Sequence, residues 1–215
     1  MACLQDRVFI ITHAGFIDVY RKTGSEYMKL SAIPNNDLPS PSDLAACRRH
    51  QRLYVSDLQL NGVWIIRKPF SESAIFEHFA KVIQANGLSV TPDGRLVITT
   101  RLPYSIRVYQ PDGKPILHIP LTGTNIEDPC QATLDSHDNF IICSGLDPNH
   151  RQSVSKMSNA GNVQVSTHIA SELIVIMVLI LAQINVVRAW LFRCAYSGDA
   201  RQMFGVSCSG KYLVV

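Results

Sequence analysis

The sequence predicts an all-β protein made of successive four-stranded antiparallel sheets. Short apolar runs alternate with turn signals over most of the chain. One such run also recurs at nearly constant spacing, because the runs that begin at Phe9, Leu53, Leu96 and Phe140 start 44, 43 and 44 residues apart. A period of about 40–45 residues is typical of the blades of β-propellers. We therefore expect a partial β-propeller of about 3–4 four-stranded antiparallel blades, with a non-propeller apolar segment near the C-terminus.

The clearest repeat spans Gly87 to Leu121. Residues rich in Val, Ile, Leu, Tyr and Thr, which suit a pleated surface, predict four strands here. These expected strands are Leu88–Val90, Leu96–Thr100, Ile106–Tyr109 and Ile116–Ile119. Two Pro-Asp-Gly tripeptides separate the first pair and the last pair, and they predict tight hairpin turns around Gly94 and Gly113. A sheet of this size is expected to pack against neighbours on both faces.

The remaining repeats are recognised by the same strands and turns. Third strands are expected at Ile17–Tyr20, Val63–Ile66 and Val154–Met157, and first strands at Leu44–Cys47 and Gln131–Leu134. The N-terminal repeat is expected to lack its opening strand, because Met1 comes too late to supply one. The junction Ser71–Ala85 would suit either a short helix or an outer strand with a long loop.

The repeat stops after about residue 167. Leu173–Ala182 is uninterrupted apolar sequence, and the apolar character continues to Phe192. A membrane span needs about 20 apolar residues, so we expect a buried helix or strand and keep membrane insertion as the alternative. Gly205–Val215 resembles the opening of a further blade. The expected divisions are 1–167 (blades), 168–197 (apolar insertion) and 198–215 (a new blade), in a ring that is truncated, aberrantly spliced or closed by self-association.

Composition points away from several functions. The formal charge of +3 is too small to imply a nucleic-acid footprint, and the adjacent Arg48, Arg49 and Arg52 are interpreted as solvated turn charges. Six cysteines without a CxxC pair and an N-terminus unlike a signal peptide favour a cytoplasmic setting. Cys130 and His137 flank one turn without a partner pair for zinc. Ser207 lacks the flanking glycine of a nucleophile elbow. We assign no catalytic residue, cofactor or metal.

Two stretches resemble a known repeat family. Leu53–Ile66 and Gly87–Tyr109 resemble NHL repeats, and the resemblance extends in register over roughly residues 5 to 165. It implies a β-propeller like those at the C-terminal end of tripartite-motif proteins. Asp57 and Asn61 match the family's aspartate and asparagine, and Gly87, Gly94 and Gly113 mark the repeat. The repeats differ at the position of Asp57, where the others carry His13, Thr100 and Ser144.

These observations predict a non-enzymatic protein-interaction scaffold with an unknown protein partner. Its binding loops are expected at Leu58–Gly62, Arg101–Ser105 and Leu146–Gln152. The chain carries no element that assigns ubiquitin-ligase activity.

Two alternatives stay open. An RNA-binding propeller would use a rim expected to gather basic and aromatic residues, namely Arg48, Arg49, Arg101, Tyr104 and Arg107. A gluconolactonase-like metal-dependent hydrolase would need several oxygen ligands at the mouth of the first strands. The residues expected there are Asp43, Gly87 and Gln131, which supply one carboxylate.

Overall fold

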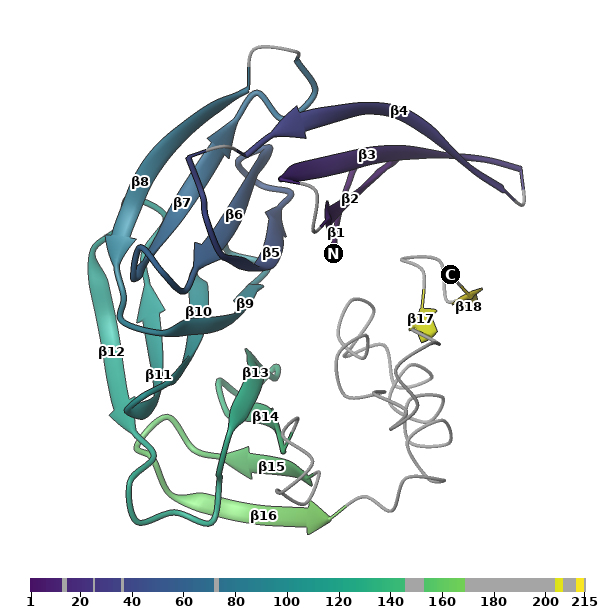
Figure 1. Cartoon of the computed structure of the whole chain (residues 1–215). Coiled ribbons are helices and arrows are strands. Elements are labelled where there is room, and N and C mark those ends of the chain that lie inside the picture. Colours follow the sequence, from purple (N-terminus) through teal and green to yellow (C-terminus); the bar gives the residue numbers. More distant parts are fainter. Residues whose placement is uncertain are drawn as a thin grey trace. The chain divides into compact units, whose positions relative to one another are not determined.

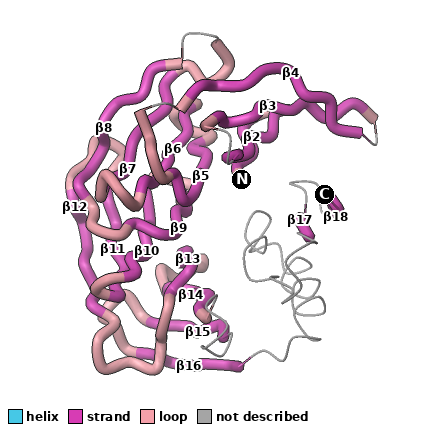
Figure 2. The backbone as a smooth tube through the Cα atoms, viewed as in Figure 1, coloured by secondary structure: helices cyan, strands magenta, loops and turns pink. Residues whose placement is uncertain are grey.

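The computed structural model is all-β. It describes residues 1–12, 15–24, 26–35, 37–71, 74–145, 153–168, 204–206 and 212–214. Along this described backbone every regular element is a strand (Figure 2). The strands form four four-stranded antiparallel sheets and a two-stranded one, which confirms the predicted partial β-propeller. Within these ranges no helix is long and apolar enough to cross a membrane, and the apolar run Leu173–Ala182 lies outside them.

The chain divides into two compact units, Met1–Pro120 and Leu121–Val215. The first unit holds three sheets, in which the strands neighbour one another in chain order (Figure 1). The first sheet contains β1 (Ala2–Leu4), β2 (Arg7–Thr12), β3 (Phe16–Thr23) and β4 (Glu26–Pro34). The second contains β5 (Pro41–Cys47), β6 (Arg52–Asp57), β7 (Gly62–Arg67) and β8 (Ile75–Lys81). The third contains β9 (Ala85–Val90), β10 (Leu96–Arg101), β11 (Tyr104–Tyr109) and β12 (Pro115–Pro120).

The second unit repeats the same meander. Its four-stranded sheet contains β13 (Pro129–Leu134), β14 (Phe140–Ser144), β15 (Ser153–Met157) and β16 (Val163–His168). A separate hairpin contains β17 (Phe204–Val206) and β18 (Tyr212–Val214). Val206 pairs with Tyr212 just as Val90 pairs with Leu96 in the third sheet and Leu134 with Phe140 in the fourth. The hairpin β17–β18 therefore has the register of a first and second blade strand.

The period seen in the sequence corresponds to equivalent strands. Phe9, Leu53, Leu96 and Phe140 lie in β2, β6, β10 and β14, the second strand of each sheet, and all four side chains are fully buried. Each sheet contributes large apolar residues at this position because the second strand lies inside the sheet, where both of its edges are paired.

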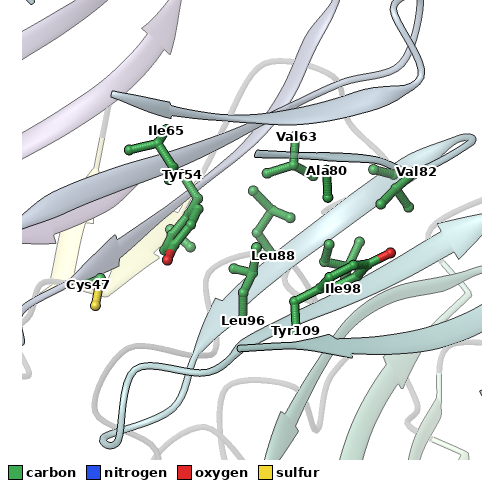
Figure 3. Packing of buried hydrophobic residues seen from close by; sticks show 12 residues of the cluster. Cys47, Tyr54, Val63, Ile65, Ala80, Val82, Leu88, Leu96, Ile98 and Tyr109 are labelled. Atoms are coloured by element: carbon green, nitrogen blue, oxygen red, sulfur yellow. The ribbon is translucent and has the colours of Figure 1, made fainter. Parts of the chain in front are cut away.

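The sheets of the first unit pack face to face. The first strands of neighbouring sheets contact one another, β1 against β5 and β5 against β9. Between the second and third sheets, Val63 and Ile65 pack with Leu88, Leu96 and other apolar side chains (Figure 3). Burying each such side chain contributes about 1.5–3 kcal/mol. An equivalent cluster joins the first and second sheets.

An aromatic residue on an outer strand reinforces the junction between the second and third sheets. Phe79 of β8 contacts Tyr54 edge-on at 5.0 Å and Tyr109 of the third sheet at 6.0 Å. Such pairs add about 0.5–1.5 kcal/mol beyond their buried area. Phe79 comes from the junction that the sequence left open, and the structure shows a strand there, β8, rather than a helix.

Two expectations were wrong. The N-terminal sheet has its opening strand, because the three residues of β1 are enough to pair with β2 and to bury Ala2 and Leu4. Arg52 is not a solvated turn charge. It begins β6 and is buried, where its guanidinium donates to the Tyr54 hydroxyl and the Pro111 carbonyl, each at 2.5 Å.

Candidate interaction edge

The strands of the first unit run between two opposite ends of the sheets. We use the word edge for these ends, where the connections lie, and not for the outermost strands. Because neighbouring strands are antiparallel, connections alternate between these edges. We call one the turn edge; it carries the connections β1–β2, β3–β4, β5–β6, β7–β8, β9–β10 and β11–β12. The loop edge carries β2–β3, β4–β5, β6–β7, β8–β9 and β10–β11.

Asp57, at the end of β6, fastens two connections of the loop edge. Its side chain is fully buried. One carboxylate oxygen accepts a hydrogen bond from the Ser40 amide at 2.7 Å, and the other accepts one from the Leu60 amide at 2.8 Å. Charge-assisted hydrogen bonds of this kind are stronger than neutral ones. Asp57 therefore holds the β4–β5 and β6–β7 connections in place, a structural role.

Asn61 holds the next connection, β8–β9, by hydrogen bonds. It adopts a left-handed backbone conformation, with φ of 52°. Its carbonyl accepts from the Val82 amide at 2.9 Å, and its side-chain oxygen accepts from the Gln84 amide at 3.2 Å. The Gln84 carbonyl in turn accepts from the Arg101 amide at 3.1 Å. The connections β6–β7 and β8–β9 are thus hydrogen-bonded to each other, and β8–β9 is bonded to Arg101, the last residue of β10, where the β10–β11 connection starts.

Each of these three joined connections exposes one large apolar side chain. Leu60 is 45% exposed, Ile83 52% and Leu102 68%. We call these three residues the apolar ridge. Single exposed apolar residues are ordinary, but one on each of three joined loops indicates an interaction surface. Lys81 and Arg101 flank the ridge at the ends of β8 and β10.

The residues expected to form one basic rim are not brought together. Arg48 and Arg49 lie on the β5–β6 connection, at the turn edge, where Arg49 donates to the Asp93 carbonyl at 3.3 Å. Arg101 and Tyr104 lie at the opposite end of β10 and β11, at the loop edge. Arg107 is in the middle of β11, opposite Ile98. The length of a strand separates the two groups, because connections alternate between edges.

The repeat glycines serve close approaches between turns and sheets. Gly94 has φ of 94°, and a Cβ there would lie 3.0 Å from the His50 ring of the neighbouring sheet. Gly113 has φ of 90°, and its Cβ would lie 3.2 Å from the Phe79 carbonyl. Gly87 lies within β9, where its amide donates to the Thr99 hydroxyl at 3.0 Å. These positions support the fold.

Of the residues expected at a lactonase-type metal site, Asp43 is engaged by backbone amides. The Asp43 carboxylate accepts backbone hydrogen bonds from Leu44 at 2.7 Å and from Leu88 of the third sheet at 2.8 Å. Gly87 has no side chain, and Gln131 belongs to the second unit. In the described part of the chain, no group of three or more His, Cys, Asp or Glu side chains could hold a metal ion.

Sequence reasoning missed Asn35, a buried residue of the loop edge. It is 1% exposed, and among the described residues neither its amide nitrogen nor its amide oxygen has a hydrogen-bond partner. It follows β4 directly, as Val82 follows β8 and Leu121 follows β12, and both of those residues are buried. The signal was present in the sequence: a polar residue stands where the next two repeats place apolar ones. The predicted binding loop Leu146–Gln152 lies outside the described residues.

Comparison with known proteins identifies the architecture. No family model matches the chain, and no curated protein does. Solved structures match at low identity. The neighbours are β-propellers. Virginiamycin B lyase from Staphylococcus aureus shares 16% identity with a TM-score of 0.53, over 78% of this chain and 54% of its own. A chain of a nidogen/laminin complex shares 15% with a TM-score of 0.53, over 75% of this chain and 61% of its own.

A hydrazine synthase chain from Kuenenia stuttgartiensis is also similar, at 13% identity and a TM-score of 0.59, over 79% of this chain and 49% of its own. This chain therefore spans about half to three fifths of the length of these structures. At such identities the likeness concerns the propeller fold. The similar structures include both enzymes and a protein of a binding complex.

Proposed function

We propose that this chain is a non-enzymatic protein-interaction module of NHL-like propeller type, and that it binds a protein partner through the apolar ridge. The observation that carries the proposal is the exposure of Leu60, Ile83 and Leu102 on loops that are held by side-chain hydrogen bonds of Asp57, Asn61 and Thr100. The NHL-like assignment rests on the match of Asp57 and Asn61 to the family's aspartate and asparagine, and their hydrogen bonds to loops of the second and third sheets support it.

The energetics favour a preformed binding surface. Full burial of an apolar side chain such as Leu60 or Leu102 contributes about 1.5–3 kcal/mol. Ordering a flexible loop on binding would offset much of that gain. Here the loops are already tied by Asp57, Asn61 and Gln84, so less ordering is left to do on association. The fold neighbour from a nidogen/laminin complex supports a binding use of the same architecture.

The ridge favours a protein partner over RNA. RNA recognition uses exposed aromatic rings for stacking together with a cationic groove. Tyr104 is half-buried, and the cations Arg48 and Arg49 lie at the other edge. The three residues of the apolar ridge are aliphatic, which suits an apolar protein segment.

Quantitative affinity purification tests the proposal. Partners captured by the wild-type chain are compared with those of the double variant Leu60→Asp/Leu102→Asp. A matched control, Met28→Asp/Ile116→Asp, places the same charges at exposed apolar positions of the outer strands β4 and β12. We expect the ridge variant to lose specific partners that the control retains. Identical partner sets for the two variants would overturn the proposal.

Two further assays distinguish the alternatives on the same proteins. Filter binding at low salt tests for RNA, and ridge-independent RNA affinity would favour the RNA-binding alternative. A lactonase assay with added divalent cations tests for the hydrolase. Metal-dependent turnover by the wild-type chain would show that the module is an enzyme.

A further inference from the structure

A second surface lies at the turn edge, on the connection between β5 and β6. This connection and the start of β6 carry three guanidinium groups, those of Arg48, Arg49 and Arg52. Arg48 and Arg49 are exposed, while Arg52, the first residue of β6, is buried. The proposed protein-binding ridge at the opposite edge leaves this cluster unexplained.

The charges of this cluster are not neutralised locally. Of the carboxylates on the adjacent inner turns, Asp6 pairs with Arg21 at 2.8 Å and Asp93 pairs with Arg95 at 2.7 Å. No ion pair joins the cluster itself to a carboxylate in the ranges that the structure describes. Arg49 and Arg52 donate instead to uncharged oxygens, the Asp93 carbonyl, the Pro111 carbonyl and the Tyr54 hydroxyl.

The turn that carries the arginines is held on both sides. Gln51 adopts φ of 49°, and its side-chain amide donates to the Arg48 carbonyl at 2.6 Å. The Gln51 side chain also accepts a hydrogen bond from Gln5 of the β1–β2 turn. On the other side, His50 lies against Gly94 of the β9–β10 turn. The exposed guanidinium groups therefore extend from a fixed backbone.

The charges of the cluster also reach His50. Partial desolvation is the main cause that lowers the pKa of its ring, and the charges of Arg52 and Arg49 lower it further.

The chemistry of the surroundings selects the kind of anion. The three inner turns β1–β2, β5–β6 and β9–β10 contain no Phe, Tyr or Trp and no exposed large apolar residue that could enter a lipid surface; their one aromatic ring, His50, lies against Gly94. What they offer is guanidinium groups, whose planar fork pairs with carboxylates or phosphates in a bidentate manner. The small net charge of the chain disfavours the phosphates of a nucleic acid and leaves carboxylates as the favoured partner.

We propose that Arg48 and Arg49 form a docking point for an acidic, Asp/Glu-rich segment of a protein partner. With the apolar ridge at the other edge, the first unit then presents two chemically different binding surfaces. This inference goes beyond the proposed function and does not depend on it, because the two surfaces lie at opposite ends of the strands.

Fluorescence anisotropy tests the inference with three defined probes: a labelled oligoglutamate peptide, an oligouridylate RNA of equal charge, and phosphatidylserine vesicles. The variant Arg48→Glu/Arg49→Glu is compared with Lys81→Glu/Arg101→Glu, which makes the same change of charge at the loop edge. We expect the first to weaken oligoglutamate binding about tenfold or more and the second to change it less than about twofold. Equal losses in both variants would show unspecific attraction and overturn the inference.

Two additional readouts make the outcome decisive. Arg48→Lys/Arg49→Lys keeps the charge and removes the planar guanidinium fork, so we expect the affinity for oligoglutamate to fall several-fold. An unchanged affinity would contradict bidentate recognition. Tighter wild-type binding to the RNA or to the vesicles than to the peptide would also overturn the inference. Ridge variants such as Leu60→Asp/Leu102→Asp should leave peptide binding intact, so failure of the ridge proposal and failure of this one are distinguishable.

Discussion

The two edges of the first unit are held by different means. At the turn edge the backbone closes its own turns: the Thr91 amide donates to the Arg95 carbonyl and the Gly94 amide to the Thr91 carbonyl, each at 2.9 Å. At the loop edge, polar side chains hold the connections, above all the buried Asp57 at the end of β6 and Asn61 in the β6–β7 connection. Turn stability therefore depends on glycine conformations, and loop position depends on a few polar side chains.

The largest effect is expected where one side chain holds two loops. Asp57→Ala leaves the amides of Ser40 and Leu60 without their acceptor, and we expect a loss of about 3 kcal/mol in the free energy of unfolding. Thr100→Val, at the equivalent position of the third sheet, removes contacts to the Pro103 carbonyl and the Ser105 hydroxyl and should cost about 1 kcal/mol. Urea unfolding followed by circular dichroism measures both. Equal losses would show that the carboxylate has no special role.

The turn edge should respond most to its glycines. Gly94→Ala forces a side chain into φ of 94° and against the His50 ring, and we expect a loss of about 2 kcal/mol. Gly24→Ala meets φ of 64° but no atom within 4 Å, so only the backbone cost of about 1 kcal/mol remains. Thermal unfolding of the two variants checks the order. A larger loss for Gly24→Ala would contradict the close approach of the two turns.

In contrast to the substitutions above, replacing Asn35 should stabilise the loop edge. Its buried side-chain amide has no hydrogen-bond partner within the part of the chain that the structure describes, and Val82 shows that an apolar residue suits the position. We expect Asn35→Val to raise the free energy of unfolding by about 1 kcal/mol and Val82→Asn to lower it. Denaturant titration measures the change. A destabilised Asn35→Val variant would indicate that the amide is bound in the native protein.

The smallest effect is expected at a turn that is held both by backbone hydrogen bonds and by a side chain. The β13–β14 turn closes through its backbone, yet Asp135 also accepts hydrogen bonds from the amides of His137 and Asn139 and from the Lys156 side chain. Burial acts to raise the pKa of Asp135, but the hydrogen bonds from Lys156 and from these amides outweigh it, so the pKa falls well below its ordinary value.

A carboxyl whose pKa is lowered by folding stabilises the folded state above its unfolded pKa of about 4, and this contribution is lost as the pH falls further. We expect Asp135→Asn to lower the melting temperature by a few degrees at neutral pH and by less at pH ~3. Melting curves at both values test this. A difference that is independent of pH would assign the effect to packing.

Much of the fold was predictable, because a repeated core leaves a repeated apolar pattern. The spacing of Phe9, Leu53, Leu96 and Phe140 correctly located the second strand of every sheet. The short strand β1 was not predicted, since three residues are too few to show a strand pattern in the sequence. Arg52 was misjudged because its partner, the Pro111 carbonyl, is remote in sequence.

The candidate site was less accessible from sequence. Leu60, Ile83 and Leu102 are unremarkable apolar residues in loops, and only the hydrogen bonds between those loops show that they belong to one surface. The separation of Arg48 from Arg101, in contrast, follows from counting antiparallel strands, which assigns their connections to opposite edges.

The common register of β9–β10, β13–β14 and β17–β18 has a practical meaning. In all three hairpins, the two paired residues that flank the connection are the same number of positions apart in the sequence. A connector taken from one hairpin meets matching ends in another, so residues 91–95 and 135–139 form an exchangeable cassette. A ligand-binding peptide of that length could be grafted there while the surrounding strands keep their pairing.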